Sequence, residues 1–395
     1  MTTTYDTIFS GLGAMGSAAL YQLAKRGKRV LGIDRYNPPH THGSSHGGSR
    51  ITRQAIGEGL EYTPLSLRSY EIVREIEKQT GEKLLLPCGG LLISNKEGLG
   101  THHIQNFFDN TVDAARKYDI AHEILEAKDI KKRFPVFNVG SHEYGYYEPE
   151  AGLLYPEICL RTQLDLARTL GATVHTNETV LSFNATSSGV AVKTDLGQYQ
   201  AEQLIVSAGP WLPELLQDSH QALAAHFTVV RQVMFWFDIK DNYESFKPGN
   251  FPIFIWEGRG DFATRYGMPA IDGPEGGFKI ASPSFNEVVN PSTVNRTASS
   301  AEAEALFQEQ VARCFPSVRN KCLRSAVCMY TDTHDSRFVI GRLPGLDSVL
   351  IASPCSGHGF KHSPAIGECL AQLATTGTSK IDLSGFAIEK AIAPV

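Results

Sequence analysis

A short glycine pattern near the N-terminus, Gly11-Leu-Gly13-Ala-Met-Gly16, lies between a predicted strand and a predicted helix. Gly11 permits a tight turn, Gly13 lets the backbone approach a phosphate group, and Gly16 lets the helix pack closely on the strand. The N-terminus of that helix presents unpaired N–H groups and a partial positive charge. Asp34 ends the next strand, near the ~20-residue spacing at which a carboxylate accepts hydrogen bonds from a ribose. The pattern predicts a βαβ unit that binds a dinucleotide, without indicating which one.

Bulk composition excludes several classes of protein. The chain has 395 residues, 42% hydrophobic and 20% charged, which predicts two globular domains with a sizeable core. A net charge of −5 without a dense Lys/Arg block argues against nucleic-acid binding, and no apolar run reaches the ~18 residues of a membrane span. The predicted first strand leaves no room for a signal peptide. Seven cysteines without the spacing of a disulfide framework indicate a reducing compartment, so we expect a cytoplasmic protein.

A second strand, glycine turn and helix occur near the other end of the chain. Val349-Leu-Ile-Ala-Ser leads into Pro354-Cys-Ser-Gly357-His-Gly359, and a helix is expected over residues 363–375. If both turns serve one site, the nucleotide-binding domain is discontinuous. A flavoprotein needs such a second turn, because its isoalloxazine ring is held far from the adenine. We therefore expect an α/β fold with a Rossmann-like FAD-binding domain (residues 1–85, 150–220 and 325–395) and a substrate domain with a mixed or antiparallel sheet (residues 86–149 and 221–324).

The substrate domain is expected to combine aromatic-rich strands with polar helices. Residues 227–237 and 251–256 are typical of strands in a large sheet, whereas residues 98–134 and 301–313 are expected to be helical. Residues 37–59 are expected to form a polar, glycine-rich loop.

Four segments together resemble the monomeric sarcosine oxidase family, which includes N-methyltryptophan oxidase and lies within the glycine and D-amino-acid oxidase group of flavoproteins. They are residues 11–16 with Asp34; Pro38-Pro-His-Thr-His-Gly-Ser-Ser-His-Gly-Gly-Ser-Arg50-Ile-Thr-Arg53, continuing to Gly57-Glu-Gly59; Ala326-Val-Cys-Met-Tyr-Thr331 with Asp335 and Phe338; and Ser356-Gly-His-Gly-Phe-Lys361. The resemblance extends over essentially the whole chain.

This resemblance implies FAD as the cofactor, joined through its 8α-methyl group to the sulfur of Cys328. It implies oxidation of the C–N bond of an N-substituted α-amino acid, typically an N-methyl one. A hydride equivalent passes to flavin N5, the imine hydrolyses to an aldehyde and the amino acid, and O2 is reduced to H2O2. The implied partners are a secondary amino acid and O2, and the implied state is a monomer. The implied cofactor-binding residues are Gly11, Gly13, Gly16, Asp34, Ser44, Arg50, Cys328, Gly357, His358, Gly359 and Lys361.

The resemblance also implies roles for several cationic side chains. Arg53 and Lys361 occupy the positions that anchor the substrate carboxylate, for which the planar fork of arginine is well suited. Lys279 occupies the position of a lysine near flavin N5, where a fixed cation would stabilise the anion formed as reduced flavin meets O2. His46 and Arg50 match positions that line the flavin, and a histidine titrating near neutral pH could tune the charge around the ring.

Other implied site residues shape the cavity or orient the cofactor. Tyr266 and Tyr330 match aromatic positions of the substrate cavity. His358 is expected to act structurally, by aiming backbone N–H groups and the following helix N-terminus at the N1/C2=O edge of the flavin, where negative charge accumulates on reduction.

The chain departs from the family pattern on the substrate side. Pro283 stands where members with sarcosine activity have a histidine, Cys355 replaces a phenylalanine, and Gly48-Ser49 replaces Asp-Thr. The substrate is therefore left open, and pipecolate, proline or a fructosyl amino acid are alternatives to an N-methyl amino acid. The first glycine pattern also allows an NAD(P)-dependent dehydrogenase or a silent dinucleotide-binding protein.

Two further motifs in the loop around residue 45 are interpreted as accidental. His40, His42 and His46 lack a carboxylate or cysteine partner with zinc-ligand spacing, so we expect no metal site there. Gly43-Ser-Ser-His-Gly47 matches the GxSxG pattern of serine hydrolases, but Pro38-Pro39 precedes it in place of the hydrophobic strand that a nucleophile elbow needs.

Overall fold

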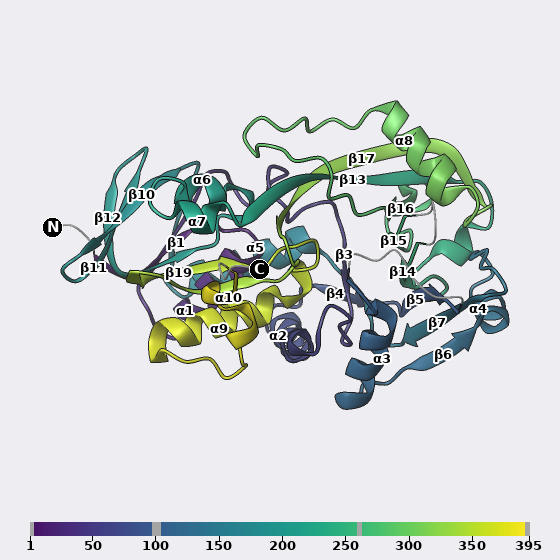
Figure 1. The fold of residues 1–395 in the computed structure, drawn as a ribbon, viewed down its shortest axis with the longest axis horizontal. Helices are drawn as coiled ribbons and strands as arrows, with labels where there is room; N and C mark the ends of the chain where they lie inside the picture. Colours follow the sequence, from purple (N-terminus) through teal and green to yellow (C-terminus); the bar gives the residue numbers. More distant parts are fainter. Residues whose placement is uncertain (1–3, 97–103, 259–262, 392–395) are drawn as a thin grey trace.

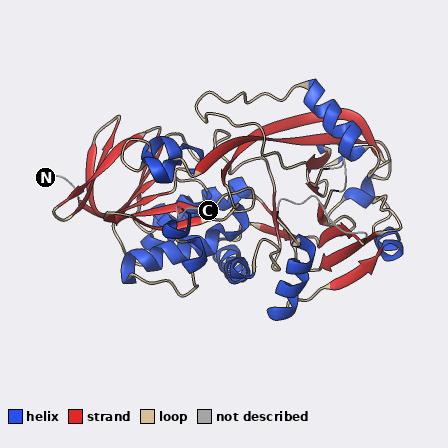
Figure 2. Cartoon of the chain, in the orientation of Figure 1, coloured by secondary structure: helices blue, strands red, loops and turns tan. Residues whose placement is uncertain are grey.

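The computed structural model describes residues 4–96, 104–258 and 263–391. Two eight-stranded sheets lie side by side, with helices on both faces of the first and a small third sheet between them (Figures 1 and 2). The expected α/β class is confirmed. No helix among the described residues combines the length and the apolarity needed to cross a membrane.

The first sheet is built around parallel strands. β1 (Thr4–Ser10) lies between β2 (Val30–Asp34) and β12 (Gln198–Val206), and Ile8 pairs with Leu31 on one side and Leu204 on the other. β9 (Thr173–Thr176) and β19 (Leu346–Ser353) extend the parallel part. The remaining strands of this sheet are antiparallel: β10 (Val180–Thr186), β11 (Gly189–Thr194) and β18 (Val339–Leu343).

Four helices gather on one face of this sheet (Figure 1). They are α1 (Ala14–Ala24), α2 (Thr63–Thr80), α5 (Pro156–Thr169) and α9 (Ser363–Thr376). Their apolar sides share one core with the strands, in which Phe9, Leu20, Leu65, Ile366 and Leu370 are almost fully buried. The short helices α6 (Leu212–Leu216), α7 (Gln221–Ala224) and α10 (Ile388–Ala391) complete this part of the fold.

The second sheet is mixed, as expected. Its strand order is β17 (Val318–Thr333), β13 (Phe227–Ile239), β16 (Phe278–Ala281), β15 (Arg265–Met268), β14 (Ile253–Trp256), β5 (Gly90–Asn95), β7 (Glu143–Glu148) and β6 (Glu123–Glu126). All neighbours are antiparallel except β14 and β5. Its core is a cluster of stacked and edge-on aromatic rings that includes Phe137, Phe251, Phe254, Phe278 and Phe315.

The third sheet lies at the centre of Figure 1 and consists of β3 (Arg50–Thr52), β8 (Gly152–Leu154) and β4 (Leu85–Pro87). It holds part of the segment expected to be a plain loop, residues 37–59. Because β3 is paired, the polar residues on either side of it have fixed positions between the two large sheets.

Two helix predictions are wrong in part. Residues 104–134 contain α3 (Phe107–Lys117), strand β6 and α4 (Ala127–Arg133), whereas the rest of the predicted helix, residues 98–103, lies outside the described residues. β6 is a short edge strand with mostly exposed side chains, so it carries little alternation in its sequence. The helix expected over residues 301–313 is α8 (Ser300–Leu306) followed by a π-helical turn, Phe307–Val311.

Candidate functional site

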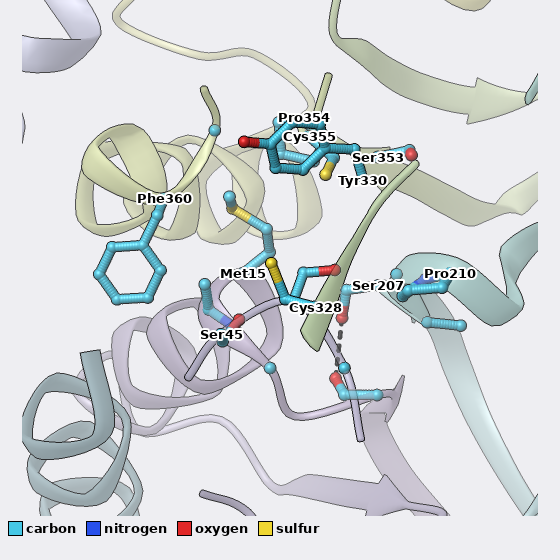
Figure 3. Close-up of a pocket in the computed structure, with 18 of the residues that line it drawn as sticks. Met15, Ser45, Ser207, Pro210, Cys328, Tyr330, Ser353, Pro354, Cys355 and Phe360 are labelled. Atoms are coloured by element: carbon cyan, nitrogen blue, oxygen red, sulfur yellow. Dashed lines mark hydrogen bonds between the residues drawn. The ribbon is translucent and has the colours of Figure 1, made fainter. Parts of the chain in front are cut away.

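A cleft of about 340 Å³ lies where the three sheets meet, within the size range of small-molecule sites. It is lined by both glycine turns, by the loop before β3 and by the facing ends of β15 and β17. Figure 3 shows Cys328 and Tyr330 of β17, Met15 of α1 and Phe360 around the pocket. Predicted site residues that line the cleft are Gly11, Gly13, Asp34, Ser44, Arg50, Arg53, Tyr266, Cys328, Tyr330, Gly357, His358, Gly359 and Lys361. Gly16, His46 and Lys279 are not among its lining residues.

The first glycine turn opens onto the cleft. Gly11 has φ +95°, and a Cβ atom there would lie 2.5 Å from the carbonyl oxygen of Ser207. A Cβ atom on Gly13 would meet only Ser45 Oγ, at 3.6 Å, so the backbone is open on that side. Gly16 does not line the cleft, and a Cβ atom there would lie 1.9 Å from the carbonyl oxygen of Gly11, so only glycine lets the helix pack this closely. The turn thus presents bare backbone to the cleft, as a phosphate cradle requires.

Asp34 lines the cleft next to this turn. Its Oδ2 accepts a hydrogen bond from Leu12 N (2.7 Å) and its Oδ1 accepts one from Tyr36 N (2.8 Å), with His40 Nε2 at 3.5 Å. These bonds fix the carboxylate at the mouth of the turn. Tyr36 and Trp211 form an aromatic wall beside it, with ring centroids 5.6 Å apart.

The second glycine turn approaches the same cleft from β19. A Cβ atom on Gly359 would lie 1.7 Å from the carbonyl oxygen of Pro354, so only glycine fits there. The N–H groups of His358 and Gly359 both donate to Cys355 O, at 2.9 and 3.0 Å, and hold the turn closed. The His358 ring stacks on Phe338 with centroids 4.7 Å apart, whereas the expected role of His358 in orienting the flavin stays a prediction.

Arg50 connects the loop before β3 to the cleft. Its Nη2 donates to Ser44 O and its Nη1 to Ser49 O, both at 2.9 Å. The neighbouring Ser44 Oγ is buried and has no hydrogen-bond partner among the described residues. A buried hydroxyl without a partner is costly, and one that lines a cleft indicates a ligand that supplies the missing hydrogen bond.

Lys279 lies behind this loop. Its ammonium group donates to Gly47 O (2.8 Å), Ser49 O (2.8 Å) and Ser49 Oγ (3.1 Å), and it lies over the ring of Trp236. Burial, together with the charge of Arg50, holds the pKa of Lys279 well below its ordinary value. Two backbone carbonyls and a hydroxyl are acceptors suited to the three protons of an ammonium group.

His46 is buried and stays neutral. Burial is the main cause that lowers its pKa to about 3, and the cationic Arg50 and Lys279 act in the same direction. The expectation that His46 tunes charge by titrating near neutral pH therefore does not hold in this environment.

The two expected anchor residues meet at a carboxylate of the chain itself. Arg53 Nη2 donates to Glu58 Oε2 (2.6 Å), and Lys361 Nζ lies 3.7 Å from Glu58 Oε1. Arg53 also donates to Ala55 O and lies over the ring of Phe107. All three charged side chains are less than a tenth exposed. Burial lowers the pKa of Lys361 to about 8, against the opposing effect of Glu58.

The opposite wall of the cleft is aromatic and contains two thiols. The hydroxyl groups of Tyr266 and Tyr330 lie 3.4 Å apart, and burial raises the pKa of both. All seven cysteines are free thiols, but only Cys328 and Cys355 line the cleft. Burial raises the pKa of Cys328, whereas the nearby Arg50 and Lys279 lower it. Pro283 also lines the cleft, so two of the departures from the family pattern face its interior.

Sequence reasoning assigned no role to two buried carboxylates of the site. Glu58 was visible in Gly57-Glu-Gly59, but no pattern indicated that it would lie between Arg53 and Lys361. Glu148 accepts hydrogen bonds from the N–H groups of Gln54 (2.6 Å) and Ala55 (3.1 Å) and from Tyr146 Oη (3.0 Å). Glu148 thus fixes the backbone that carries Arg53, from a strand almost a hundred residues away.

The histidines of the loop before β3 take part in aromatic packing. The His42 ring stacks on Tyr36 at 4.1 Å, and the His40 ring packs edge-on against the same residue at 5.0 Å. Residues 43–47 precede β3, without the strand-to-helix turn of a nucleophile elbow.

The residues present fit FAD. The open backbone at Gly13 suits a pyrophosphate, the fixed carboxylate of Asp34 suits the adenosine ribose, and the partnerless Ser44 Oγ can donate to or accept from the ligand, and all three line one cleft. The second turn and Cys328 line the same cleft and would hold the flavin ring.

Comparisons with known proteins agree with this assignment. Residues 10–373 match the family model described as FAD dependent oxidoreductase. The chain is similar to monomeric sarcosine oxidase from Streptomyces avermitilis (42% identity over 96% of each chain). It is also similar to N-methyl-L-tryptophan oxidase from Yersinia pestis (32% identity over 98% of this chain and 99% of the relative). Among solved structures, NikD, an unusual amino acid oxidase essential for nikkomycin biosynthesis, shares the fold (TM-score 0.82, 24% identity, 98% of each chain).

These matches set aside the alternative of an NAD(P)-dependent dehydrogenase, because the matched family is FAD dependent over nearly the whole length of the chain. The expected resemblance is confirmed: the chain belongs to the FAD dependent oxidoreductase family and, within it, to the monomeric sarcosine oxidase family that includes N-methyltryptophan oxidase.

Proposed function

We propose that the chain is an FAD-dependent oxidase of N-substituted α-amino acids, with N-methyl amino acids as the favoured class and O2 as the acceptor. One observation carries the proposal. Arg53 and Lys361 are two buried cations that share one protein carboxylate, Glu58, at the wall of the cleft. This group is left with a net positive charge below the pKa of Lys361, so it can accept the carboxylate of an amino acid.

The chain's own residues would orient the substrate. Arg53 and Lys361 hold the carboxylate, and Tyr266 and Tyr330 form the aromatic wall against which the amine end lies. FAD, when bound, would supply the redox chemistry: two electrons and two protons, one proton from the substrate carbon and one from the amine nitrogen, would leave the substrate as it becomes an imine and would reduce O2 to H2O2. The imine product is hydrolysed by water to an aldehyde and the amino acid. Lys279 is held behind the Ser49 backbone as a fixed cation for the oxygen step.

Covalent attachment through Cys328 is part of the proposal. The thiol faces the cleft; burial raises its pKa, and the charges of Arg50 and Lys279 act against that rise, towards the thiolate form that is the reactive species. Cys355 is the one other cleft-lining thiol in the described chain, so it is the natural comparison.

A monomer in the cytoplasm completes the proposal. The free state of all seven cysteines agrees with a reducing compartment, and the name of the sarcosine oxidase relatives suggests the monomer.

Anaerobic bleaching of the flavin against a panel of amines tests this function. The panel contains sarcosine, larger N-methyl amino acids, proline, pipecolate and fructosyl amino acids, and each acid is paired with its methyl ester. We expect bleaching by an N-methyl amino acid, recolouring in air with one H2O2 per substrate, and a large loss of rate with the ester. Faster bleaching by proline, pipecolate or a fructosyl amino acid would move the substrate to that class. A flavin that no amine bleaches would indicate a silent binding protein.

A further inference from the structure

A group of three potential metal ligands lies outside the cleft, where β13 begins and β17 ends. His226, His334 and Asp335 each offer one ligand atom, and the three atoms all lie within 4.8 Å of one another. Among the described residues, no other histidine, cysteine and carboxylate side chains form such a group. The cleft is lined by none of the three residues, so the proposed oxidase chemistry leaves the group without a role.

The sheet register explains why these side chains meet. Phe227 of β13 pairs with Thr333 of β17, so His226 and His334 occupy the next position of the same antiparallel ladder. Their rings pack edge-on with centroids 4.9 Å apart. The chain then turns at Ser336, which has φ +56° and donates from its N–H to Thr333 O, and this turn brings Asp335 to the same side.

His226 supplies the most specific evidence. Its Nε2 is buried and has no hydrogen-bond partner among the described residues. A buried ring nitrogen without a partner, next to a second imidazole and a carboxylate, has the chemistry of a ligand rather than of a packed core side chain.

Asp335 is oriented by its own neighbours. Its Oδ1 accepts hydrogen bonds from Thr333 Oγ1 (3.1 Å) and Arg337 N (3.2 Å). Its Oδ2 lies 3.7 Å from Nε of Arg337, whose side chain is half exposed, so this ion pair is weak and a divalent ion would displace it. Hydrogen bonds that fix a carboxylate in this way are typical of the groups that support metal ligands.

We propose that His226, His334 and Asp335 bind a divalent first-row transition metal ion, with Zn²⁺ as the reference ion. Two imidazoles and one carboxylate suit Zn²⁺ and leave one tetrahedral position for water. Bonds of 2.0–2.2 Å require ligand atoms roughly 3.3 Å apart, so the exposed side chains of His334 and Asp335 would move inward towards His226.

The site is connected to the second glycine turn. The carbonyl oxygen of Ser336 lies 3.2 Å from His358 Nε2, and Thr333 Oγ1 lies 3.5 Å from Ser356 Oγ. A bound ion would therefore stabilise residues 333–336, which contact the second glycine turn. Its effect would be on the stability of the protein and on the surroundings of the cofactor.

Zinc titration of the untagged, flavin-loaded protein tests the proposal. After dialysis against a chelator, Zn²⁺ is titrated in competition with a chromogenic chelator, and thermal unfolding is recorded with and without Zn²⁺. We expect one ion per chain, binding at least tenfold weaker in His334→Ala, Asp335→Asn and His226→Ala, and a rise in Tm with Zn²⁺ that His334→Ala abolishes. His220→Ala, which removes a nearby histidine outside the group, should bind as wild type.

Three outcomes would overturn the proposal. They are the absence of saturable binding, unchanged binding in His334→Ala, and loss of binding in His42→Ala, which would place the ion in the loop before β3. Because His334 is exposed, its variant keeps the fold, and the flavin spectrum verifies this independently.

Discussion

Arg53 Nη2 donates a 2.6 Å hydrogen bond to Glu58 Oε2, although both side chains are almost completely buried. The proposed carboxylate anchor is therefore built around a carboxylate that belongs to the protein. A substrate carboxylate has to share Arg53 and Lys361 with Glu58 or displace it. Glu58 also keeps the two cations from repelling each other when the cleft holds no anion.

Substitution of Arg53 should weaken the binding of simple carboxylates. We expect Arg53→Ala to weaken the binding free energy of acetate analogues by about 1.5–3 kcal/mol, the range for hydrogen bonds to charged groups. The Kd is measured by perturbation of the flavin spectrum. Glu58→Gln should tighten the same ligands, because it removes the competing charge. Arg29→Ala, at an exposed ion pair with Asp6, is the matched control. An unchanged Kd in Arg53→Ala would remove this residue from the anchor.

Carboxylate binding should weaken as the pH rises through about 8. The ordinary pKa of lysine is 10.5, and burial lowers that of Lys361 to about 8, so its ammonium group is present below this value and lost above it. We expect kcat/KM to fall as the pH rises through about 8, because kcat/KM reports ionisations of the free enzyme. Lys361→Met should lower kcat/KM and remove this dependence on pH. The same fall in the variant would assign the ionisation to another group.

Lys279→Met should slow the reaction of reduced flavin with O2. Loss of one fixed charge-stabilising group costs about a hundredfold or more in comparable sites. Stopped-flow measurement of the two half-reactions provides the control within one protein, since reduction by substrate should change far less. Because the pKa of Lys279 is lowered, its ammonium group loses its proton at a pH below the usual range of lysine. The reaction of wild-type reduced flavin with O2 should therefore slow as the pH rises through that lower range. Equal effects on both half-reactions would contradict the oxygen role.

The flavin colour should remain with the denatured wild-type chain and be released from Cys328→Ser. Acid precipitation followed by absorbance of pellet and supernatant measures this directly. Cys355→Ser removes the other thiol of the cleft and should keep the colour in the pellet. Colour in the wild-type supernatant would contradict the link.

Glu148→Gln should affect the anchor from a distance. It weakens the bonds that fix the N–H groups of Gln54 and Ala55, so we expect lower stability by about 1–3 kcal/mol and a higher Kd for carboxylates. Chemical unfolding and ligand titration measure the two effects. Lower stability with an unchanged Kd would limit Glu148 to a purely structural role.

Much of the fold follows from local sequence patterns. The glycine turns at 11–16 and 357–359 are steric requirements, since a Cβ atom at Gly11 or Gly359 would overlap backbone, and such requirements are visible in a sequence. Strand β6 was missed because its side chains are mostly exposed on an edge. The division into an FAD-binding and a substrate domain stays a prediction, which the two separate large sheets support.

The site was less predictable than the fold. Residue types and their neighbours in sequence pointed to Arg53, Lys361 and Cys328, all of which line the cleft. The position of Lys279 behind Ser49, and that of Glu58 between two cations, depend on contacts between segments that are distant in sequence. The neutrality of His46 likewise follows from burial, which its sequence neighbours do not reveal.

Strands β13 and β17 pair along almost their whole length, from Phe227 opposite Thr333 to Ile239 opposite Val318, and run from the helix-covered sheet into the second sheet (Figure 1). This long two-stranded ladder connects the two halves of the molecule and would resist a hinge-like closure over the ligand. The width of the cleft is then set by the backbone, and discrimination between amino acids of different size falls to the side chains that line it. Variants that change substrate range should therefore arise at positions such as Pro283 and Cys355, without any change in how the two halves are arranged.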